Sequence, residues 1–446
     1  MSRDNSELNV ISKFRRVFKV EDVSIDLLKP HPNRARVHSR AQIRKIQLGI
    51  RAYGIMKPIL VGPGMVIISG HAVVEAAKRE GYKELPVICV DDLTPDLLRA
   101  YMHADNRLAE DGEWNNDLLK IEFEHFIKIP DFDLEVVGFE LPEIDIALQQ
   151  QPSRGGDPID LVPPVAATAI SKPGDLWILG RHRILCGDAR DSSALALLCN
   201  GKQAAVVFCD PPYNVPVEGH VCGNGKIHHQ EFVVACGELS TEEFTSFLIT
   251  CLNNLARSSI AGAVHYVCMD WRHVAELLAA GRQVYDALLN LCVWAKDRGG
   301  MGSYYRSAHE LVAVFKAGKG TPRNNVQLGR FGRNRTNVWQ YPSASTTSRK
   351  PGEENVLVMH PTVKPVALVA DALLDSSLRG EIVLDSFLGS GSTLLAAERV
   401  GRICYGMEYE GRYIDLAIRR WQRLTGEQAR HALTGETFDS KEVSCD

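Results

Sequence analysis

The hydrophobic pattern divides the chain into two regions in which short apolar runs alternate with amphipathic stretches. Short β-branched runs predict strands, and apolar positions at helical spacing predict helices. In the first region, about residues 18–106, strands are expected at 58–61, 65–69 and 85–90, and helices at 42–53 and 72–80. This pattern predicts a small α/β unit.

The second region, about residues 174–425, repeats strand-then-helix units. Strands are expected at 182–186, 205–209, 263–269, 284–294, 307–316, 381–385 and 403–407. Helices are expected at 192–199, 241–255, 366–375, 392–400 and 413–424. This alternation predicts an α/β fold with a doubly wound, Rossmann-like sheet.

A helical stretch at 115–128 and a segment rich in Gln, Pro, Ser and Gly at 149–173 separate the two regions. We interpret the second of these as a linker, because it has no periodic pattern. The expected order is a polar tail (1–17), a small domain (18–110), a helical connector (111–148), the linker (149–173), a large domain (174–430) and a second tail (431–446).

The composition, with 446 residues, 45% hydrophobic and 24% charged, is typical of a globular protein. None of the eleven cysteines forms a C-x-x-C pair, and His228, His229 and His309 have no acidic or thiol partners at ligand spacing, so no metal site is expected. Several cysteines lie in apolar runs, which predicts buried free thiols and a cytoplasmic location: Cys89, Cys186, Cys209, Cys268 and Cys404. No apolar run reaches the ~18 residues of a membrane helix, so no membrane partner is expected.

The charge is unevenly distributed, although the formal net charge is only −4. Residues 311–352 contain eight Lys or Arg and no Asp or Glu. Such a segment favours contact with nucleic-acid phosphates and base edges. The arginines expected to bind DNA are Arg323, Arg330, Arg333 and Arg335.

The sequence Asp210-Pro211-Pro212-Tyr213 follows the apolar run 205–209 directly. It therefore lies at the carboxyl end of a predicted buried strand, where open α/β sheets bind their ligands. Two adjacent prolines fix φ and remove two backbone donors, which holds Asp210 and Tyr213 on a stiff loop.

A second motif, the glycine turn Asp385–Thr393, joins a predicted strand to a predicted helix. Its backbone N–H groups can approach a ligand closely, and the next strand ends at Glu408, where a carboxylate can accept hydrogen bonds from ribose hydroxyls. The turn lacks a Gly-Lys-Ser/Thr sequence, and Asp385 suits a cationic ligand better than a phosphate. The pattern predicts a cofactor that contains a nucleoside.

Taken in order, these motifs resemble the S-adenosylmethionine-dependent amino-methyltransferases of DNA whose catalytic half precedes the cofactor half. The resemblance covers about 174–425 and includes 186–188, 210–214, 293–296, 307–310, 360–365, the glycine turn, Glu408 and Tyr413. It implies S-adenosylmethionine as cofactor and a target-recognition segment at 317–358. The implied cofactor pocket consists of Asp188, Lys364, Asp385, Phe387, Gly389, Gly391, Thr393 and Glu408.

The same resemblance implies catalysis by Asp210, Pro211, Pro212 and Tyr213 on a base flipped out of double-stranded DNA. Asp210 would accept one hydrogen of the target amino group and the Pro211 carbonyl the other, while Tyr213 stacks on the base. In this family a DPPY sequence usually accompanies adenine, so methylation at adenine N6 is expected. The alternatives are methylation at cytosine N4, an RNA or protein substrate, and a ParB-like DNA-binding protein with a degenerate methyltransferase half.

The N-terminal region (18–110) resembles ParB-like domains in residues 30–33, Gly70-His71 and 104–107. Nucleotide-binding members usually carry arginines just after the glycine turn. Here 72–74 are Ala-Val-Val, which argues against binding and hydrolysis of CTP. The sequence leaves open a homodimer and a partner restriction enzyme.

Overall fold

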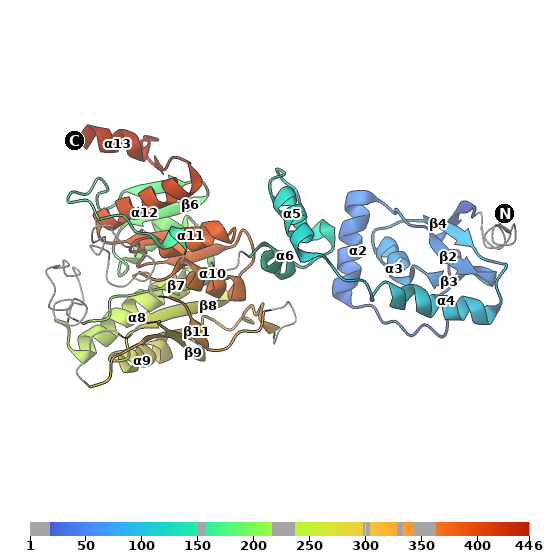
Figure 1. The fold of residues 1–446 in the computed structure, drawn as a ribbon, viewed down its shortest axis with the longest axis horizontal. Helices are drawn as coiled ribbons and strands as arrows, with labels where there is room; N and C mark the ends of the chain where they lie inside the picture. The colour runs from blue at the N-terminus through green and yellow to red at the C-terminus, as the bar shows by residue number, and fades with distance from the viewer. Residues whose placement is uncertain are drawn as a thin grey trace, which may run out of the picture. The chain divides into compact units, whose positions relative to one another are not determined.

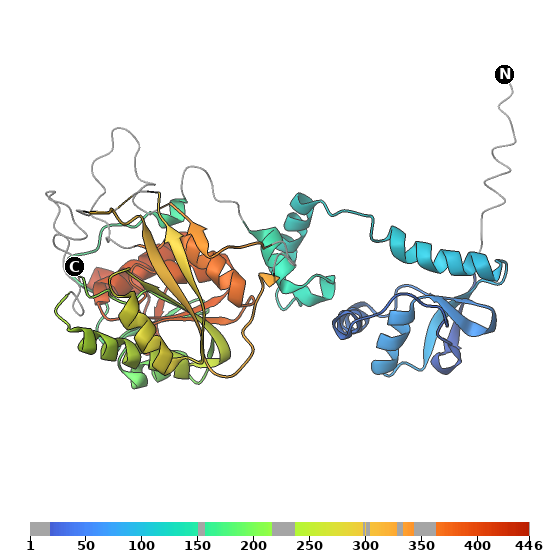
Figure 2. The ribbon, with the colours of Figure 1, turned by 90° about the horizontal axis from the view of Figure 1, so that it is seen from below.

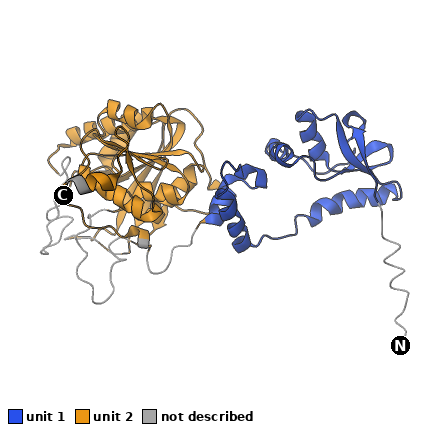
Figure 3. Cartoon of the chain, turned by 90° about the horizontal axis from the view of Figure 1, so that it is seen from above, with its two compact units in different colours: residues 1–148 blue, residues 149–446 orange. Residues whose placement is uncertain are grey.

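The structure, a computed structural model, describes residues 18–149, 157–215, 237–297, 299, 304–327, 333–342 and 363–445. The chain divides into two compact units, Met1–Leu148 and Gln149–Asp446 (Figure 3). Each unit has its own hydrophobic core.

The first unit contains a four-stranded sheet in the order β1-β4-β2-β3. Its strands are β1 (Val20–Ser24), β2 (Ile59–Gly62), β3 (Val66–Ser69) and β4 (Glu84–Cys89). Its helices are α2 (Arg40–Tyr53), α3 (His71–Arg79) and α4 (Pro95–Leu108), with short 3₁₀ turns η1 (Ile25–Leu27) and η2 (Pro63–Met65). The pattern did not predict α4, although Thr94 caps it by accepting a hydrogen bond from the Leu97 amide and Pro95 stands at its first position, both ordinary helix-start signals.

The first unit ends in a helical segment with α5 (Asn116–Ile127), η3 (Leu134–Val137) and α6 (Leu141–Leu148). Asn115 caps α5 by accepting hydrogen bonds from the amides of Asp117 and Leu118. Phe139 packs edge-on against Trp114 and Phe123, which ties α5 to the approach of α6. The helix expected at 115–128 is therefore present as α5.

The second unit is built on a ten-stranded sheet in the order β11-β9-β10-β8-β7-β12-β13-β6-β5-β14 (Figures 1 and 2). The strands are β5 (Leu176–Leu179), β6 (His182–Cys186), β7 (Ala204–Cys209), β8 (Ser259–Met269), β9 (Ala287–Ala295), β10 (His309–Lys316), β11 (Val338–Gln340), β12 (Ile382–Asp385), β13 (Ile403–Glu408) and β14 (Arg430–His431). The helices are α7 (Ser192–Cys199), α8 (Thr241–Arg257), α9 (Val274–Val284), α10 (Val366–Ser376), α11 (Ser392–Arg399), α12 (Gly411–Thr425) and α13 (Phe438–Cys445), preceded by the turn η4 (Pro158–Asp160).

Helices cover both faces of this sheet, as its alternating side chains require. Val206 and Phe208 of β7 face the cluster formed with α10, α11 and α12, whereas Val207 and Cys209 face α7, α8 and α9. This arrangement confirms the doubly wound, Rossmann-like fold.

The direction of the strand order reverses between β7 and β12. From β7 the chain leads outward to β8 on one side, and from β12 it leads outward to β13 on the other. β7 and β12 are parallel neighbours, with Val383 beside Val206 and Leu384 beside Val207. The carboxyl ends of these two strands form the switch point where such sheets bind ligands.

Some elements and one burial state differ from the sequence prediction. The pattern missed β1, α9, β5, β11, β14 and α13, and the strand expected at 284–294 begins only at Ala287, because α9 extends to Val284. Cys186, Cys209, Cys268 and Cys404 are buried free thiols, as expected. Cys89 is exposed, because it is the last residue of β4 and its side chain lies outside the small core.

Candidate active site

The acidic residues singled out in the sequence meet at one edge of the large sheet. β6, β13, β12 and β7 are parallel, so their carboxyl ends lie side by side. Asp188 follows β6, Asp210 follows β7, and Asp385 and Glu408 end β12 and β13. Glu408 lies beside Cys186 in register, and its carbonyl accepts a hydrogen bond from the Gly187 amide at 2.9 Å.

The Asp210 carboxylate is held through both of its oxygens. The Tyr213 hydroxyl donates to Oδ1 at 2.6 Å, and the Lys364 ammonium donates to Oδ2 at 2.5 Å. Asn214 fixes the end of this loop, since its side chain donates to the Leu239 carbonyl and accepts from the Gly237 amide. The loop that two prolines stiffen is therefore also fixed by side-chain hydrogen bonds.

Glu310 belongs to the same cluster. In the sequence it is only part of the motif at 307–310, which predicts no role for it. It lies on β10, opposite Trp294 of β9, and is 5% exposed. Its Oε2 accepts from the Lys364 ammonium at 2.9 Å and lies 3.1 Å from the Tyr213 hydroxyl oxygen, whose single hydrogen is shared with the closer Asp210. The available signal was a carboxylate at the start of an otherwise apolar strand, because such a residue is rarely buried without a partner.

Lys296 completes the cluster by pairing with Glu310 Oε1 at 2.5 Å. Its ammonium also lies 4.8 Å from the centre of the Trp294 ring. Lys364 therefore pairs with both Asp210 and Glu310, whereas Lys296 pairs with Glu310. The two positive and two negative charges sum to zero.

Burial and pairing oppose each other in this cluster. Burial raises the pKa of Asp210, and the Lys364 ammonium opposes that rise. Glu310 is also buried, but the ammonium groups of Lys364 and Lys296 outweigh burial and lower its pKa to about 2. Burial lowers the pKa of Lys364, whereas Asp210 and Glu310 raise it, and the net direction is upward.

Lys364 is the one predicted cofactor residue that the structure places with the catalytic loop. It lies two residues before α10, its side chain is 4% exposed, and its ammonium contacts Asp210, Glu310 and the Tyr213 hydroxyl. Two carboxylates of the catalytic cluster thus neutralise this ammonium, and the cofactor-binding role of Lys364 stays a prediction.

The glycine turn surrounds the second half of the site. The Asp385 carboxylate accepts from the Phe387 amide at 2.9 Å, and its interaction with the Thr393 hydroxyl lowers its pKa in opposition to burial. Gly389 has φ +51°, and its amide donates to Glu408 Oε2 at 2.9 Å. Gly391 has φ +88° and begins α11, where a Cβ would lie 2.9 Å from the Ala417 Cβ.

The turn has properties that fit a bound nucleoside carrying a positive charge. Burial raises the pKa of Asp385 to about 7 and also raises the pKa of Glu408, so a nearby cation would be stabilising. The buried hydroxyls of Ser386 and Ser392 have no hydrogen-bond partner within the described residues. A Cβ on Gly389 would meet no protein atom within 4 Å, which leaves this side of the turn open.

Of the other two predicted pocket residues, Asp188 follows β6 and Phe387 lies within the turn itself. Asp188 is bound by the Arg190 guanidinium, with distances of 3.0 and 2.6 Å. Phe387 is partly buried, with its ring centre 6.2 Å from that of Phe247.

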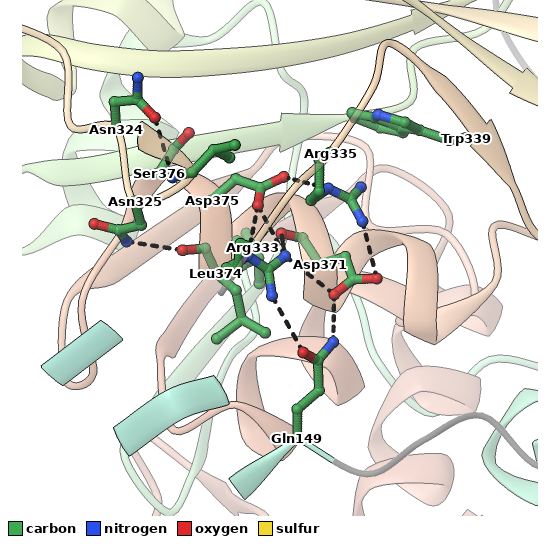
Figure 4. A network of polar contacts seen from close by, with 12 residues as sticks. Gln149, Asn324, Asn325, Arg333, Arg335, Trp339, Asp371, Leu374, Asp375 and Ser376 are labelled. Atoms are coloured by element: carbon green, nitrogen blue, oxygen red, sulfur yellow. Dashed lines mark hydrogen bonds and ion pairs between the residues drawn. The ribbon is translucent and has the colours of Figure 1, made fainter. Parts of the chain in front are cut away.

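Arg333 and Arg335 do not have the surroundings expected of DNA-binding residues (Figure 4). Arg333 donates to Asp375 at 2.9 Å and pairs with Asp371 at 3.1 Å, and its side chain is only 6% exposed. Arg335 pairs with the same two carboxylates at 2.8 and 3.1 Å. Both guanidinium groups are thus paired with carboxylates on α10, and their DNA-binding role stays a prediction.

The remaining two arginines differ from these. Arg323 is 41% exposed and forms a single pair with Glu381 at 3.0 Å. Arg330 lies outside the described residues, as do His228 and His229.

The described part of the chain contains neither a candidate membrane-spanning helix nor a candidate metal site. No described helix is both long and apolar enough to cross a membrane. Within the described ranges, no three His, Cys, Asp or Glu side chains gather as metal ligands would.

The fold and the edge site together define an α/β protein whose acidic residues and glycine turn gather at the switch point of its sheet. Residues 204–419 match the family model N6_N4_Mtase, described as DNA methylase. Residues 117–173 match the model HTH_ParB_Mtase, described as ParB-methyltransferase HTH domain. The chain is thus similar to the N6/N4 DNA methylase family over residues 204–419 and to ParB-methyltransferase helix-turn-helix domains over residues 117–173, a range that includes most of the connector and linker assigned from the sequence.

Two curated relatives are similar over part of the chain. Type II methyltransferase M.ScaI of Streptomyces caespitosus is 35% identical over 90 residues, which is 20% of this chain and 29% of the relative. Type II methyltransferase M.HinfI of Haemophilus influenzae is 25% identical over 230 residues, which is 49% of this chain and 63% of the relative. The chain therefore spans less than two thirds of either relative.

Among solved structures, the chain is similar to PvuII DNA methyltransferase, described as cytosine-N4-specific. The two are 16% identical, the match covers 54% of this chain and 86% of that one, and the TM-score is 0.40. A likeness of this degree carries no argument about the base that is modified.

Proposed function

We propose that this protein is a site-specific DNA methyltransferase that transfers a methyl group from S-adenosylmethionine to the exocyclic amino group (N6) of adenine. The observation that carries the proposal is the position of Asp210 beside Asp385 at the switch point between β7 and β12. The first residue belongs to a loop suited to an amino group, and the second opens a turn suited to a cationic nucleoside.

The chemistry of the target explains the need for Asp210. An exocyclic amino nitrogen is a poor nucleophile because its lone pair is delocalised into the aromatic ring. Asp210 can accept one amino hydrogen and the Pro211 carbonyl the other, which draws the nitrogen toward tetrahedral geometry and localises the lone pair. Positioning of this kind supplies a large part of a catalysed rate.

The glycine turn accounts for the cofactor. S-adenosylmethionine supplies an electrophilic methyl group on a positively charged sulfur. Glu408 would accept hydrogen bonds from ribose hydroxyls, and the ionised Asp385 carboxylate would supply negative charge to a cationic cofactor. Ser386 and Ser392 supply buried hydroxyls for the polar groups of the cofactor.

Double-stranded DNA is the proposed partner. An amino group in a duplex can reach such a site only if its base is flipped out of the helix. Tyr213 is the proposed stacking residue. Arg323 is the remaining described candidate for a phosphate contact, and Arg330 stays a candidate from the sequence. The buried free thiols favour a reducing cytoplasm as the place of action.

The test is a methylation assay with radiolabelled S-adenosylmethionine and double-stranded DNA, followed by digestion and chromatography of the nucleosides. We expect N6-methyladenine from the unmodified protein, and no product from Asp210→Ala, which should still bind the cofactor. Asp270→Ala is the matched control, because Asp270 follows β8 at the same sheet edge, and its ion pair within the described residues is with Arg272 rather than with the catalytic cluster. Near-normal turnover by Asp210→Ala would show that the proposed mechanism is wrong.

Methylation at cytosine N4 is the second candidate, since the matched family model covers both target atoms. The same cluster can hold either amino group, because Asp210 and the Pro211 carbonyl contact only the –NH₂ hydrogens. The same chromatogram decides between the two, since N4-methylcytosine and N6-methyladenine elute separately.

A further inference from the structure

The Asp210 carboxylate is not free to receive a target amino group. Its Oδ2 is 2.5 Å from the Lys364 ammonium, and its Oδ1 is 2.6 Å from the Tyr213 hydroxyl. The hydroxyl is neutral and can remain, because a carboxylate oxygen accepts more than one hydrogen bond. The ammonium is a greater obstacle, since its charge cancels that of Asp210.

The same ammonium also opposes the proposed reaction electrostatically. The target nitrogen gains positive charge as the N–CH₃ bond forms and the S–CH₃ bond breaks, and it later releases a proton. A lysine paired with Asp210 alone would cancel the negative charge of Asp210, which would then no longer stabilise that positive charge. In a buried site such a charge is felt strongly.

Glu310 offers Lys364 a second partner. Its Oε2 is 2.9 Å from the Lys364 ammonium, and its other oxygen is held by Lys296 at 2.5 Å. Glu310 lies on β10, which is hydrogen-bonded to β8 on one side and β9 on the other, so its backbone is fixed. Lys364 thus lies between a carboxylate on a loop and a carboxylate on a central strand.

We propose that Glu310 is a positioning residue that retains Lys364 when the target amino group binds to Asp210. The inference rests on the proposed methyltransferase function and adds a division of labour between the two carboxylates. Asp210 contacts the substrate, and Glu310 acts only through Lys364. Glu310 is not a proton acceptor in this scheme, because two ammonium groups stabilise its charged form.

Charge balance explains why Lys296 is also needed. With Glu310 present, the four side chains sum to zero. Without the Glu310 charge, Lys364 would pair more tightly with Asp210, and the cluster would carry one positive charge. The titratable groups that interact electrostatically with Asp210 are the charged Lys364 and Glu310, the Tyr213 hydroxyl, the buried thiols of Cys209 and Cys268, and Asp385.

The first test is Glu310→Gln, which has the same shape and no charge. We expect its kcat at the pH plateau to fall by about tenfold to a hundredfold, in line with the loss of a preorganised electrostatic group. The acidic limb of its pH–rate profile should shift to lower pH, since a negative charge that raised the pKa of Asp210 has been removed. Binding of S-adenosylhomocysteine, whose sulfur is uncharged, should not change, and this measurement also confirms folding.

A pair of double variants separates position from net charge. Glu310→Gln with Lys364→Gln and Glu310→Gln with Lys296→Gln both restore neutrality, but only the first removes the ammonium from Asp210. We expect the Lys364 double variant to regain plateau activity relative to Glu310→Gln, although at higher pH, because Asp210 then lacks its counter-ion. The Lys296 double variant should regain much less.

The results distinguish this inference from the function on which it depends. If the unmodified protein methylates no DNA, the proposed function is wrong. If it is active and Glu310→Gln has an unchanged plateau, or a lower plateau with an unmoved acidic limb, the positioning role is wrong. Equal recovery in the two double variants would also overturn it. Glu310→Asp, which keeps the charge on a shorter side chain, should lie between Glu310→Gln and the unmodified protein.

Discussion

At the scale of single residues, the candidate site consists of two clusters of opposite electrostatic character. Asp210 and Glu310 each have an ammonium partner, whereas the hydrogen bonds described for the buried Asp385 and the half-buried Glu408 come from backbone amides and a hydroxyl. The balanced cluster suits a neutral amino group. The negative cluster suits a cation. A methyl transfer between the two would carry positive charge from the second cluster toward the first.

Tyr213→Phe separates the two roles of Tyr213. The ring remains available for stacking, but Asp210 loses a hydrogen bond of 2.6 Å from a neutral donor to a charged acceptor. We expect kcat to fall by about tenfold, the usual scale for such a bond, while DNA affinity is retained. Single-turnover methylation and fluorescence anisotropy measure the two quantities. An unchanged kcat would mean that the hydroxyl does not orient Asp210.

Asp385 predicts a pH dependence of cofactor binding. Its pKa is raised to about 7, so the carboxyl is protonated below that pH and cannot stabilise a cation. We expect the affinity for S-adenosylmethionine to weaken as the pH falls below about 7, by up to about tenfold per pH unit. Calorimetric titration of Asp385→Asn should show weaker binding with little pH dependence.

The raised pKa of Asp385 also makes stability depend on pH, but in the opposite direction to cofactor binding. An unfolded chain loses the Asp385 proton in the ordinary carboxyl range, but the folded protein keeps it up to about pH 7. This residue therefore lowers the free energy of unfolding as the pH rises toward 7. Asp385→Asn should raise the melting temperature at pH 8 and have little effect at pH 4. A lower melting temperature at pH 8 would contradict the assignment.

At the scale of elements, α10 connects the catalytic cluster to the basic segment. Lys364 precedes its first turn, and Asp371 and Asp375 lie along its length, where they bind Arg333 and Arg335 (Figure 4). Gln149 and Tyr341 also bind Asp371. This network holds the chain on either side of β11 against the helix that carries Lys364.

Arg333→Ala should therefore act on stability rather than on DNA binding. It leaves part of Asp375 buried without a partner, and breaking a buried pair costs about 3 kcal/mol. Urea unfolding measures this loss. The matched control is Arg323→Ala, whose exposed pair with Glu381 contributes no more than about 1 kcal/mol. If Arg333→Ala lost no stability but its DNA binding depended less on salt, Arg333 would be a DNA-binding residue instead.

The sequence could predict elements whose signal is local. The strand before Asp210, the turn Asp385–Thr393 and the strand ending at Glu408 follow from apolar runs and glycines. The partner of an ion pair is not local. Lys364 is 154 residues from Asp210, and Arg333 is 42 residues from Asp375. Spacing in the sequence therefore could not show that carboxylates of α10 partly neutralise the arginine-rich segment. Short elements such as β5 and β11 form because a neighbouring strand is present, which a local pattern does not reveal.

At the scale of the whole molecule, the segment read as a linker is partly built into the second unit. Asp160 accepts a hydrogen bond from the Val366 amide at the start of α10, and Asp157 pairs with Arg399. Val162 packs with Val363 and Leu416 in a small cluster that Tyr413 also contacts. Residues 157–171 therefore contact the start of α10, beside Lys364, and α12, which follows Glu408.

A comparison of two fragments tests where the folded methyltransferase unit begins. Asp415 is fully buried, and its carboxylate accepts hydrogen bonds from the amides of Ile170 and Ser171 and from the Ser171 hydroxyl. A fragment of residues 174–446 removes all three donors and leaves a buried charge unpaired, whereas a fragment of residues 149–446 keeps them. We expect the shorter fragment to melt at a clearly lower temperature, because an unsatisfied buried carboxylate is strongly destabilising. It should also bind S-adenosylmethionine more weakly, since Asp415 lies on the helix that follows Glu408.

Asp415→Asn in the longer fragment is the control, because it removes the charge but keeps the segment. If the two fragments had the same melting temperature and affinity, residues 157–171 would be a linker after all, and the domain would begin near Gly174 as its sequence pattern predicts.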